Sequence, residues 1–423
     1  MAKLLTVRSR SASIDLAYII LAAFLLRILP ILLGSPAASD INYYKAQAVP
    51  VLNNQNIYAV TRGVFPYSPF TMFVPALCLL FSNISSIPFH ITMKIPALIG
   101  DISLSVAIYY WVILYKNDKE IAFKAAILYA LNPVAILISA FQGNMMSIPT
   151  LFMFLAVMMI IYNGEKNYRL SALLLGLAIA FRGYPILLLP LILLKSGLSF
   201  SKKIKYVMYA TLPVALIFLP FLILDNRSVF REIFGYGTSI EYGYGAIESV
   251  ISLYSLVSSF DFTMVTGTVQ KHLTYLTILL NHVPPSAIIM QLMAYSKAIF
   301  LAAYLIVILQ YKRLGLLRLI LATYLGFYFF YAHAASQYFI WIIPFVHFLD
   351  DRFSGWYIIL GSYAIISVYL CYHPFTLFGI LSISPYPTMK NIFLNEFIAL
   401  SLFWSLCGVW FFGLLFNKER PAV

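Results

Sequence analysis

Charged residues are scarce in this sequence. Only 10% of its 423 residues are Asp, Glu, Lys or Arg, against about 25% in a soluble domain, and 62% are hydrophobic. A water-soluble fold of this size could not bury so much apolar surface, so lipid is the solvent that fits the composition. The apolar runs recur at about 20 residues, the length that a bilayer requires. We therefore predict an all-α, polytopic transmembrane helical bundle with about 11 to 13 spanning or half-spanning helices.

Cysteine and the common catalytic motifs are also scarce. The three cysteines, Cys78, Cys371 and Cys407, have no metal-ligand spacing and form no disulfide framework. The sequence has no Gly-rich phosphate loop, no nucleophile elbow and no Asp-x-Asp pair in its predicted outer loops. The motifs that nucleotide-dependent enzymes and metal-dependent hydrolases require are therefore missing from the sequence. We expect no required cofactor, assign no residue to a metal, and find no support in the sequence for a divalent ion.

Positive charge is abundant, with a formal net charge of +13, but the basic residues form no arm or stripe. They fall in short loops between apolar segments, as the positive-inside rule requires, so we expect no nucleic-acid partner. Basic residues also precede the first apolar run, 14–33, and residues 35–39 after it show no signal-peptide cleavage pattern. We interpret this run as a retained first helix.

The Lys and Arg distribution predicts an orientation with both termini in the cytoplasm. The segment 34–90 is then an outer loop, and its short apolar run 70–81 is expected to form a re-entrant or interfacial hairpin. The other predicted spans are 14–33, 91–115, 121–140, 146–162, 206–224, 286–309, 316–332, 338–349, 356–371 and 393–416. We treat 1–423 as a single integral membrane domain. Within it we expect a catalytic module at 14–224, an outer region at 225–285 and C-terminal helices at 286–417.

The stretch 170–194 has basic residues on both flanks and the sequence Arg182-Gly183-Tyr184-Pro185 in its middle. A single crossing would place one basic flank outside. A broken hairpin, with both ends in the cytoplasm and Arg182 at the outer tip, keeps both basic flanks in the cytoplasm. Broken helices of this kind place polar groups at membrane depth beside a cavity.

Polar residues gather, under this orientation, near the outer ends of the predicted helices. Charged groups at membrane depth are costly unless paired or hydrated, which makes them functional candidates. The candidates are Asp40, Asp101, Gln142, Asn144, Arg182, Tyr184, Glu241, Tyr244, His333, Gln337 and Tyr338. Arg182 is the hardest to explain structurally, because no helix cap requires a cation between two apolar arms. Asp101 lies about 15 Å into its helix, at 1.5 Å per residue, and could instead pair structurally with Arg27 or Lys94.

The other candidates also have structural interpretations. Asp40 could cap a loop helix, and Gln142 and Asn144 could cap a tight turn. His333 could be a satisfied core histidine, and the tyrosines could belong to an interfacial belt. The chemical interpretation treats them as one site: a lone outer carboxylate to take a proton from an attacking hydroxyl, and Arg182 to hold a departing phosphate. Aromatic rings can stack on a sugar face.

Several short segments carry a family resemblance. In chain order they are Asp40-Ile41-Asn42-Tyr43, Asn56-Ile57-Tyr58, Phe65-Pro66-Tyr67-Ser68-Pro69, Lys94-Ile95-Pro96-Ala97-Leu98-Ile99-Gly100-Asp101, Leu131-Asn132-Pro133, Phe141-Gln142-Gly143-Asn144, Arg182-Gly183-Tyr184-Pro185 and Gln337-Tyr338-Phe339-Ile340-Trp341. Together they resemble the GT-C superfamily of polytopic glycosyltransferases, in particular the branch that contains GPI mannosyltransferase I and its prokaryotic relatives. The resemblance covers most of residues 14–345 and keeps the family's order.

The resemblance implies an inverting hexosyltransferase with Asp40 as the catalytic base. Its donor would be a polyprenyl- or dolichyl-phosphate sugar, most often mannose, and its acceptor a glycan or glycolipid, lipid- or protein-linked, on the non-cytoplasmic face. The membrane would be the plasma membrane of a prokaryote or the endoplasmic reticulum of a eukaryote. Two departures stand out: Asn144 occupies a position that is often acidic, which weakens any metal role, and Arg182 replaces a usual Lys, which keeps the charge but alters its geometry.

Two other classes of function stay open at this point. A lipid-linked sugar flippase or transporter would also have broken helices, although its site should be reachable from both sides. A noncatalytic lipid-binding subunit is the second alternative. Asp40 discriminates among them, because only the enzyme requires a positioned outer carboxylate.

Overall fold

The computed structural model describes residues 10–33, 39–60, 67–235, 287–331, 334–349, 351–372 and 389–416. Within these ranges every regular element is helical and none is a strand, which confirms the predicted all-α class. The chain divides into two compact units. Unit 1 is Met1–Ile240 with Ile340–Leu349, and unit 2 is Glu241–Phe339 with Asp350–Val423.

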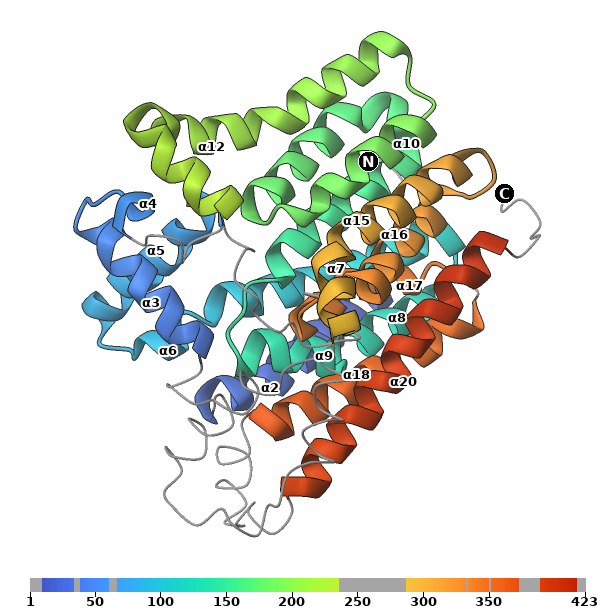
Figure 1. Cartoon of the computed structure of the whole chain (residues 1–423). Helices are drawn as coiled ribbons and strands as arrows, with labels where there is room; N and C mark the ends of the chain where they lie inside the picture. Colours follow the sequence, from blue (N-terminus) through green and yellow to red (C-terminus); the bar gives the residue numbers. More distant parts are fainter. Residues whose placement is uncertain are drawn as a thin grey trace. The chain divides into compact units, whose positions relative to one another are not determined.

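Unit 1 holds most of the helices, and those before residue 236 are drawn from blue to yellow-green in Figure 1. They are α2 (Arg10–Leu33), α3 (Ser39–Leu52), α4 (Ile57–Val60), α5 (Pro69–Ser85), α6 (Phe89–Thr92), α7 (Ile95–Lys116), α8 (Lys119–Ala130), α9 (Pro133–Ile136), the π-helix η1 (Leu137–Phe141), α10 (Ser147–Phe181), the 3-10 helix η2 (Tyr184–Leu187), α11 (Leu188–Lys195), α12 (Phe200–Gly235) and, later in the chain, α17 (Ile343–Val346).

Unit 2 contains the remaining described helices. They are α15 (Ala287–Leu309), η4 (Gln310–Lys312), α16 (Leu316–Phe330), α18 (Arg352–Tyr372) and α20 (Met389–Phe416). The 3-10 helix η5 (Ser336–Trp341) begins in unit 2 and ends in unit 1. Within unit 2, α20 packs along both α16 and α18.

Seven of the described helices are long and apolar enough to cross a membrane. They are Ala12–Leu32, Phe89–Lys116, Ser147–Phe181, Phe200–Ile233, Ala294–Lys312, Arg352–Leu370 and Asn395–Phe416. A bent pair, Lys119–Ala130 with Pro133–Phe141, makes an eighth if it is counted as one span. Helices of this number, length and composition are those of a multi-pass membrane protein.

The chain reverses inside α10 and again at Arg182. Asn163 leaves helical geometry at φ −160° and ψ 69°, and the Ser171 hydroxyl donates to the Ala156 carbonyl at 2.7 Å. A straight helix would separate residues 15 positions apart by about 22 Å, so the two halves of α10 form an antiparallel hairpin. After Arg182 the chain returns through η2 and α11, and an ion pair joins Glu165 to Lys202. Both ends of the segment around Arg182 therefore lie together, as the predicted broken hairpin requires.

The predicted span 121–140 is two helices meeting at 41°. Pro133 cannot continue α8, because its ring removes a backbone donor and clashes with the preceding turn. Asn132 starts the next helix, and its side-chain oxygen accepts from the Val134 amide at 2.8 Å. The predicted span is therefore broken at Pro133, and its two helices pass as a membrane span only when they are taken together.

Three other predicted segments differ from the structure. The outer loop 34–90 contains α3 and α4, and its run 70–81 is part of one continuous helix, α5, rather than a hairpin. The predicted span 338–349 is a 3-10 helix followed by the short α17, with Pro344 in the first turn of α17. Helix α12 continues to Gly235, past the predicted end at 224, after a kink at Asp225.

Candidate functional site

Asp40 is the second residue of α3, a helix that is not among the candidate membrane spans. Two side-chain amides from one distant turn donate to the same carboxylate oxygen, Oδ2. Gln142 Nε2 lies 2.8 Å and Asn144 Nδ2 2.9 Å from it. No described residue donates a hydrogen bond to the other oxygen, Oδ1. The carboxylate is therefore fixed through one oxygen, and the other can face a reacting group.

The turn that supplies both amides depends on Gly143. This residue has φ +78°, a left-handed conformation that favours glycine. A Cβ at this position would lie 2.6 Å from Ile41 Cδ1 and 3.1 Å from Lys94 Cγ. The turn thus lies directly against the first turn of α3, close enough for both amides to reach Asp40.

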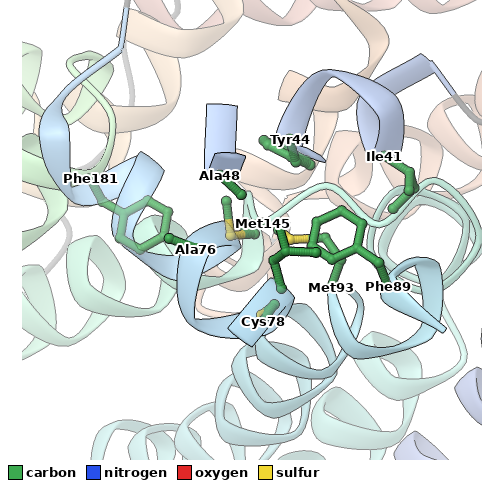
Figure 2. Packing of buried hydrophobic residues seen from close by; sticks show 10 residues of the cluster. Ile41, Tyr44, Ala48, Ala76, Cys78, Phe89, Met93, Met145 and Phe181 are labelled. Atoms are coloured by element: carbon green, nitrogen blue, oxygen red, sulfur yellow. The ribbon is translucent and has the colours of Figure 1, made fainter. Parts of the chain in front are cut away.

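An apolar cluster that these distant segments share explains why they meet, and Figure 2 shows its buried side chains packed together. Three of the polar site residues, Asp40, Asn144 and Arg182, are each followed or preceded in the chain by a buried member of this cluster. Ile41 follows Asp40, Met145 follows Asn144 and Phe181 precedes Arg182. The cluster also contains side chains of α5 and α6, and α3 packs along α5. Burial of the apolar neighbours therefore places the polar groups together at its edge.

Arg182 is 6% exposed and follows directly on α10. Its guanidinium carbon lies 3.8 Å from the centre of the Tyr67 ring, a close cation–π contact. Its Nη2 donates to the Tyr44 hydroxyl at 3.4 Å. Arg182 also lies close enough to Asp40 for its positive charge to act on that carboxylate. The base candidate and the phosphate-binding candidate are thus neighbours.

The environment raises the pKa of Asp40 above its ordinary value. Burial is the largest cause, because it removes the charged carboxylate from water. The Asn144 hydrogen bond, the Arg182 charge and the Gln142 hydrogen bond oppose this effect, in that order. A carboxylate with a raised pKa is a stronger base, which suits general-base chemistry near neutral pH.

Tyrosine rings surround this pair of charges. Tyr43 packs edge-on against Tyr67, with ring centres 6.2 Å apart, and Tyr44 lies next to both Asp40 and Arg182. The Tyr58 hydroxyl donates to the Tyr67 carbonyl at 2.7 Å, which anchors the residue that covers Arg182. Rings of this kind supply flat apolar faces with polar edges, the surface that sugars bind.

Tyr184 lies in a different environment from Arg182, two residues earlier. Its ring stacks on Trp341 at 3.7 Å between centres and 10° between planes. Its hydroxyl shares a 3.1 Å hydrogen bond with Thr150. These contacts join η2, α10 and the end of η5, and they favour a role for Tyr184 in packing the hairpin.

Asp101 makes the structural contacts that its depth in α7 suggested as one alternative. Its Oδ2 pairs with Arg27 Nε at 2.7 Å, and both side chains are fully buried. Oδ1 accepts from the Tyr129 hydroxyl at 2.9 Å, and Ser139 donates to Oδ2. With both oxygens occupied by protein donors, Asp101 ties α2, α7, α8 and η1 together.

The remaining predicted site residues lie outside the described residues or in unit 2. Glu241, Tyr244 and His333 lie outside the described residues. Gln337 and Tyr338 belong to unit 2, where the Tyr338 carbonyl accepts from the Tyr328 hydroxyl. No group of three or more His, Cys, Asp or Glu side chains suited to a metal ion occurs in the described ranges.

Gln47, on the same helix as Asp40, was missed from the sequence because 39–52 was interpreted as loop. Once α3 is a helix, Tyr44 and Gln47 follow Asp40 at intervals of four and seven and share its face. That spacing was the available signal. Pro50 and the polar residues at the start of the segment obscured it.

No protein-family model matches the chain, and no curated protein matches its sequence. The contacts around Asp40 are therefore the basis for assigning a function.

Proposed function

We propose that this protein is an inverting glycosyltransferase that takes a hexose, with mannose the first to test, from a polyprenyl- or dolichyl-phosphate donor. The acceptor is a hydroxyl of a lipid- or protein-linked glycan. One observation carries the proposal: Asp40 is held through one oxygen by Gln142 and Asn144, beside the buried cation Arg182. This pairing supplies a base for the attacking group and a positive charge for the leaving group.

The proposed reaction is a single displacement at the anomeric carbon. The acceptor oxygen forms a bond to C1 of the sugar while the bond from C1 to the phosphate oxygen breaks. The electron pair of the broken bond goes to the polyprenyl phosphate, and the proton of the acceptor hydroxyl goes to Asp40. Attack opposite the leaving group inverts the configuration at C1.

Arg182 is proposed to bind the phosphate that leaves. A guanidinium forms strong, directional hydrogen bonds to phosphate oxygens, and burial strengthens the attraction. The Tyr67 ring over its face orients the guanidinium plane. The reaction needs no metal in this scheme, because the cation that meets the developing charge belongs to the protein.

The site is proposed to open to the non-cytoplasmic side, in the plasma membrane of a prokaryote or the endoplasmic reticulum of a eukaryote, with both termini cytoplasmic. This placement rests on the basic loops, whose residues include Lys203 and Lys312. Asp40 and Arg182 then lie on the opposite side from these loops.

The test is sugar transfer by sealed membrane vesicles of both orientations that contain the protein. Purified polyprenyl-phosphate mannose, glucose and galactose are supplied with a glycolipid acceptor to the outer medium. We expect transfer in the orientation that exposes the non-cytoplasmic face, with an inverted linkage in the product. Movement of the donor across the membrane without formation of a glycosidic bond would instead establish a lipid-linked sugar flippase.

A further inference from the structure

Gln47 is a buried amide whose polar atoms have nothing to bind in the described structure. The residue is 2% exposed, and neither Nε2 nor Oε1 has a hydrogen-bond partner among the described residues. Buried polar groups are nearly always hydrogen-bonded, because burying one without a partner costs free energy. A glutamine that leaves both atoms unsatisfied is therefore a candidate for binding a ligand.

Gln47 lies on the same helix as the proposed catalytic base, about two turns further along. Residues seven apart on an α-helix lie only about 20° from the same face, so Gln47 and Asp40 share one side of α3. Tyr44, which contacts Arg182, lies between them. The exposed face of α3 carries Asn42, Lys45 and Val49 instead.

The chemistry of the amide selects the type of ligand. An amide offers donors at Nε2 and an acceptor at Oε1. An ionised phosphate oxygen only accepts, so it would leave Oε1 unsatisfied. Neighbouring hydroxyl groups both donate and accept and can satisfy the two atoms together. Gln47 therefore fits a sugar better than a phosphate.

We propose that Gln47 binds hydroxyl groups of the transferred sugar and determines which sugar the protein accepts. This inference rests on the proposed function and names a specificity-determining residue within the same site. Tyr43, one helical turn earlier and only partly buried, is the neighbour that must move to admit the sugar, since Gln47 is enclosed.

The spacing along α3 fits this assignment. Seven residues rise about 10 Å. The steps from base to attacking hydroxyl and from that hydroxyl to C1 take about 3 Å each. The sugar ring beyond C1 then brings its other hydroxyls to the level of Gln47.

The experiment compares Gln47→Leu with Gln55→Leu, the same substitution at an exposed position eight residues later. For each protein, kcat/KM is measured with the polyprenyl-phosphate sugar that the wild type uses best and with its 2-, 3-, 4- and 6-deoxy analogues. We expect the wild type and Gln55→Leu to discriminate roughly 10- to 100-fold against at least one deoxy donor. Gln47→Leu should lose that discrimination while still using the deoxy donor.

Folding of the variant is checked by thermal unfolding. Leucine has a similar volume and removes an unsatisfied buried amide, so Gln47→Leu should unfold at the wild-type temperature or above. If it does not fold, Gln47→Asn serves in its place, because it keeps the amide but withdraws it by one carbon. Unchanged discrimination in a folded variant at position 47 would overturn the proposal while leaving the transferase function intact.

A binding measurement separates the two proposals. Thermal stabilisation by polyprenyl-phosphate mannose, glucose and galactose is recorded for wild type and variants without an acceptor. Binding that discriminates deoxy analogues through Gln47, in a protein that transfers no sugar, would overturn the transferase and support the sugar site. Binding of none of these donors would overturn both.

Discussion

Two carboxylates in unit 1 contact the same short segment of chain and differ in almost every other respect. Asp101 contacts Ser139 and Asp40 contacts Gln142 and Asn144, so η1 and the turn after it lie between them. Asp101 is closed off by an ion pair and by hydroxyl donors on both oxygens. Within the described ranges, Asp40 is held on one oxygen only. The difference fits a structural role for Asp101 and the proposed catalytic role for Asp40.

The contrast also explains why depth in the membrane is a poor guide to chemistry. Asp101 is the more deeply buried acid, and its burial is compensated by Arg27, a fully buried counter-ion. Asp40 lies on a helix that is not a candidate span, and its charge is only partly compensated, so its pKa is raised. A reactive group needs this incomplete compensation.

Asp40→Asn should have the largest effect on activity. Asparagine keeps the shape of the side chain but cannot take the proton, so we expect turnover to fall by about 10²–10⁴-fold in protein that folds normally. Sugar transfer per amount of folded protein measures this. Asp118→Asn is the matched control, because Asp118 only caps α8 through the Ile121 amide at 3.0 Å and asparagine caps nearly as well. Near-wild-type turnover in Asp40→Asn would remove Asp40 from the mechanism.

Asp101→Asn should have the opposite pattern. It leaves Arg27 buried without a counter-ion, which we expect to cost about 3–5 kcal/mol of unfolding free energy. The fraction that folds should keep most of its turnover. Denaturation of purified protein in detergent, compared with the same Asp118→Asn control, measures the loss. Full stability together with lost turnover would mean that Asp101 belongs to the reactive site.

Arg182→Ala should weaken use of the lipid donor. We expect kcat/KM for the polyprenyl-phosphate sugar to fall roughly 10- to 100-fold, because a charged hydrogen bond to phosphate is lost. Arg182→Lys should retain part of the activity, since it keeps the charge but not the planar fork over Tyr67. Arg169→Ala, at an exposed arginine of α10, the helix that ends just before Arg182, is the control. Unchanged donor kinetics in folded Arg182→Ala would make Arg182 structural.

Gly143→Ala should displace the turn that holds Asp40. Gly143 and Gly197 both have positive φ, +78° and +66°, so alanine at either should cost about 1–2 kcal/mol of stability. Only at 143 would the new methyl meet other atoms, those of Ile41 and Lys94. We therefore expect turnover to fall roughly 10-fold more in Gly143→Ala than in Gly197→Ala. Equal turnover in the two variants would show that the close packing of Gly143 against Ile41 and Lys94 has no catalytic role.

Asn144→Ala should change the pH dependence more than the maximal rate. Asp40 acts as a base when ionised, so the rate falls as the pH drops through its pKa. The Asn144 hydrogen bond is the largest effect that lowers this pKa, so its loss raises the pKa further. The acid limb of the kcat/KM profile should therefore move to higher pH, whereas Asn53→Ala, at an exposed turn, should leave it in place. An acid limb that does not move would assign it to another group.

The sequence was sufficient for features that depend on long apolar runs and on charge. The helices predicted at 14–33, 286–309 and 393–416 end at the predicted residue and begin within four residues of the predicted start, because each is a continuous run of bilayer length. The reversal at Arg182 was predicted from the basic residues on either side of it. Short or irregular elements were not: α3 mixes polar and apolar residues, and the breaks at Pro133 and Pro344 divide runs that look continuous.

The contacts of the candidate site could be predicted only in part. The orientation predicted from the basic loops placed Asp40, Gln142, Asn144 and Arg182 on the non-cytoplasmic side. No local sequence pattern predicts a hydrogen bond between residues about 100 positions apart. The apolar neighbours Ile41, Met145 and Phe181 bring them together, and apolar residues are too common in this chain to identify such a cluster in advance.

The ion pair between Arg27 and Asp101 has a consequence for how the protein is made. The ribosome completes α2 well before it reaches Asp101, whose partner lies 74 residues earlier in the chain. Until then the first helix carries a cation that is costly to release into lipid, by up to about 2.5–3.5 kcal/mol at a helix centre. An unpaired Asp101 would have a similar free-energy cost in the lipid. Pairing of the two helices before they enter the lipid avoids both costs.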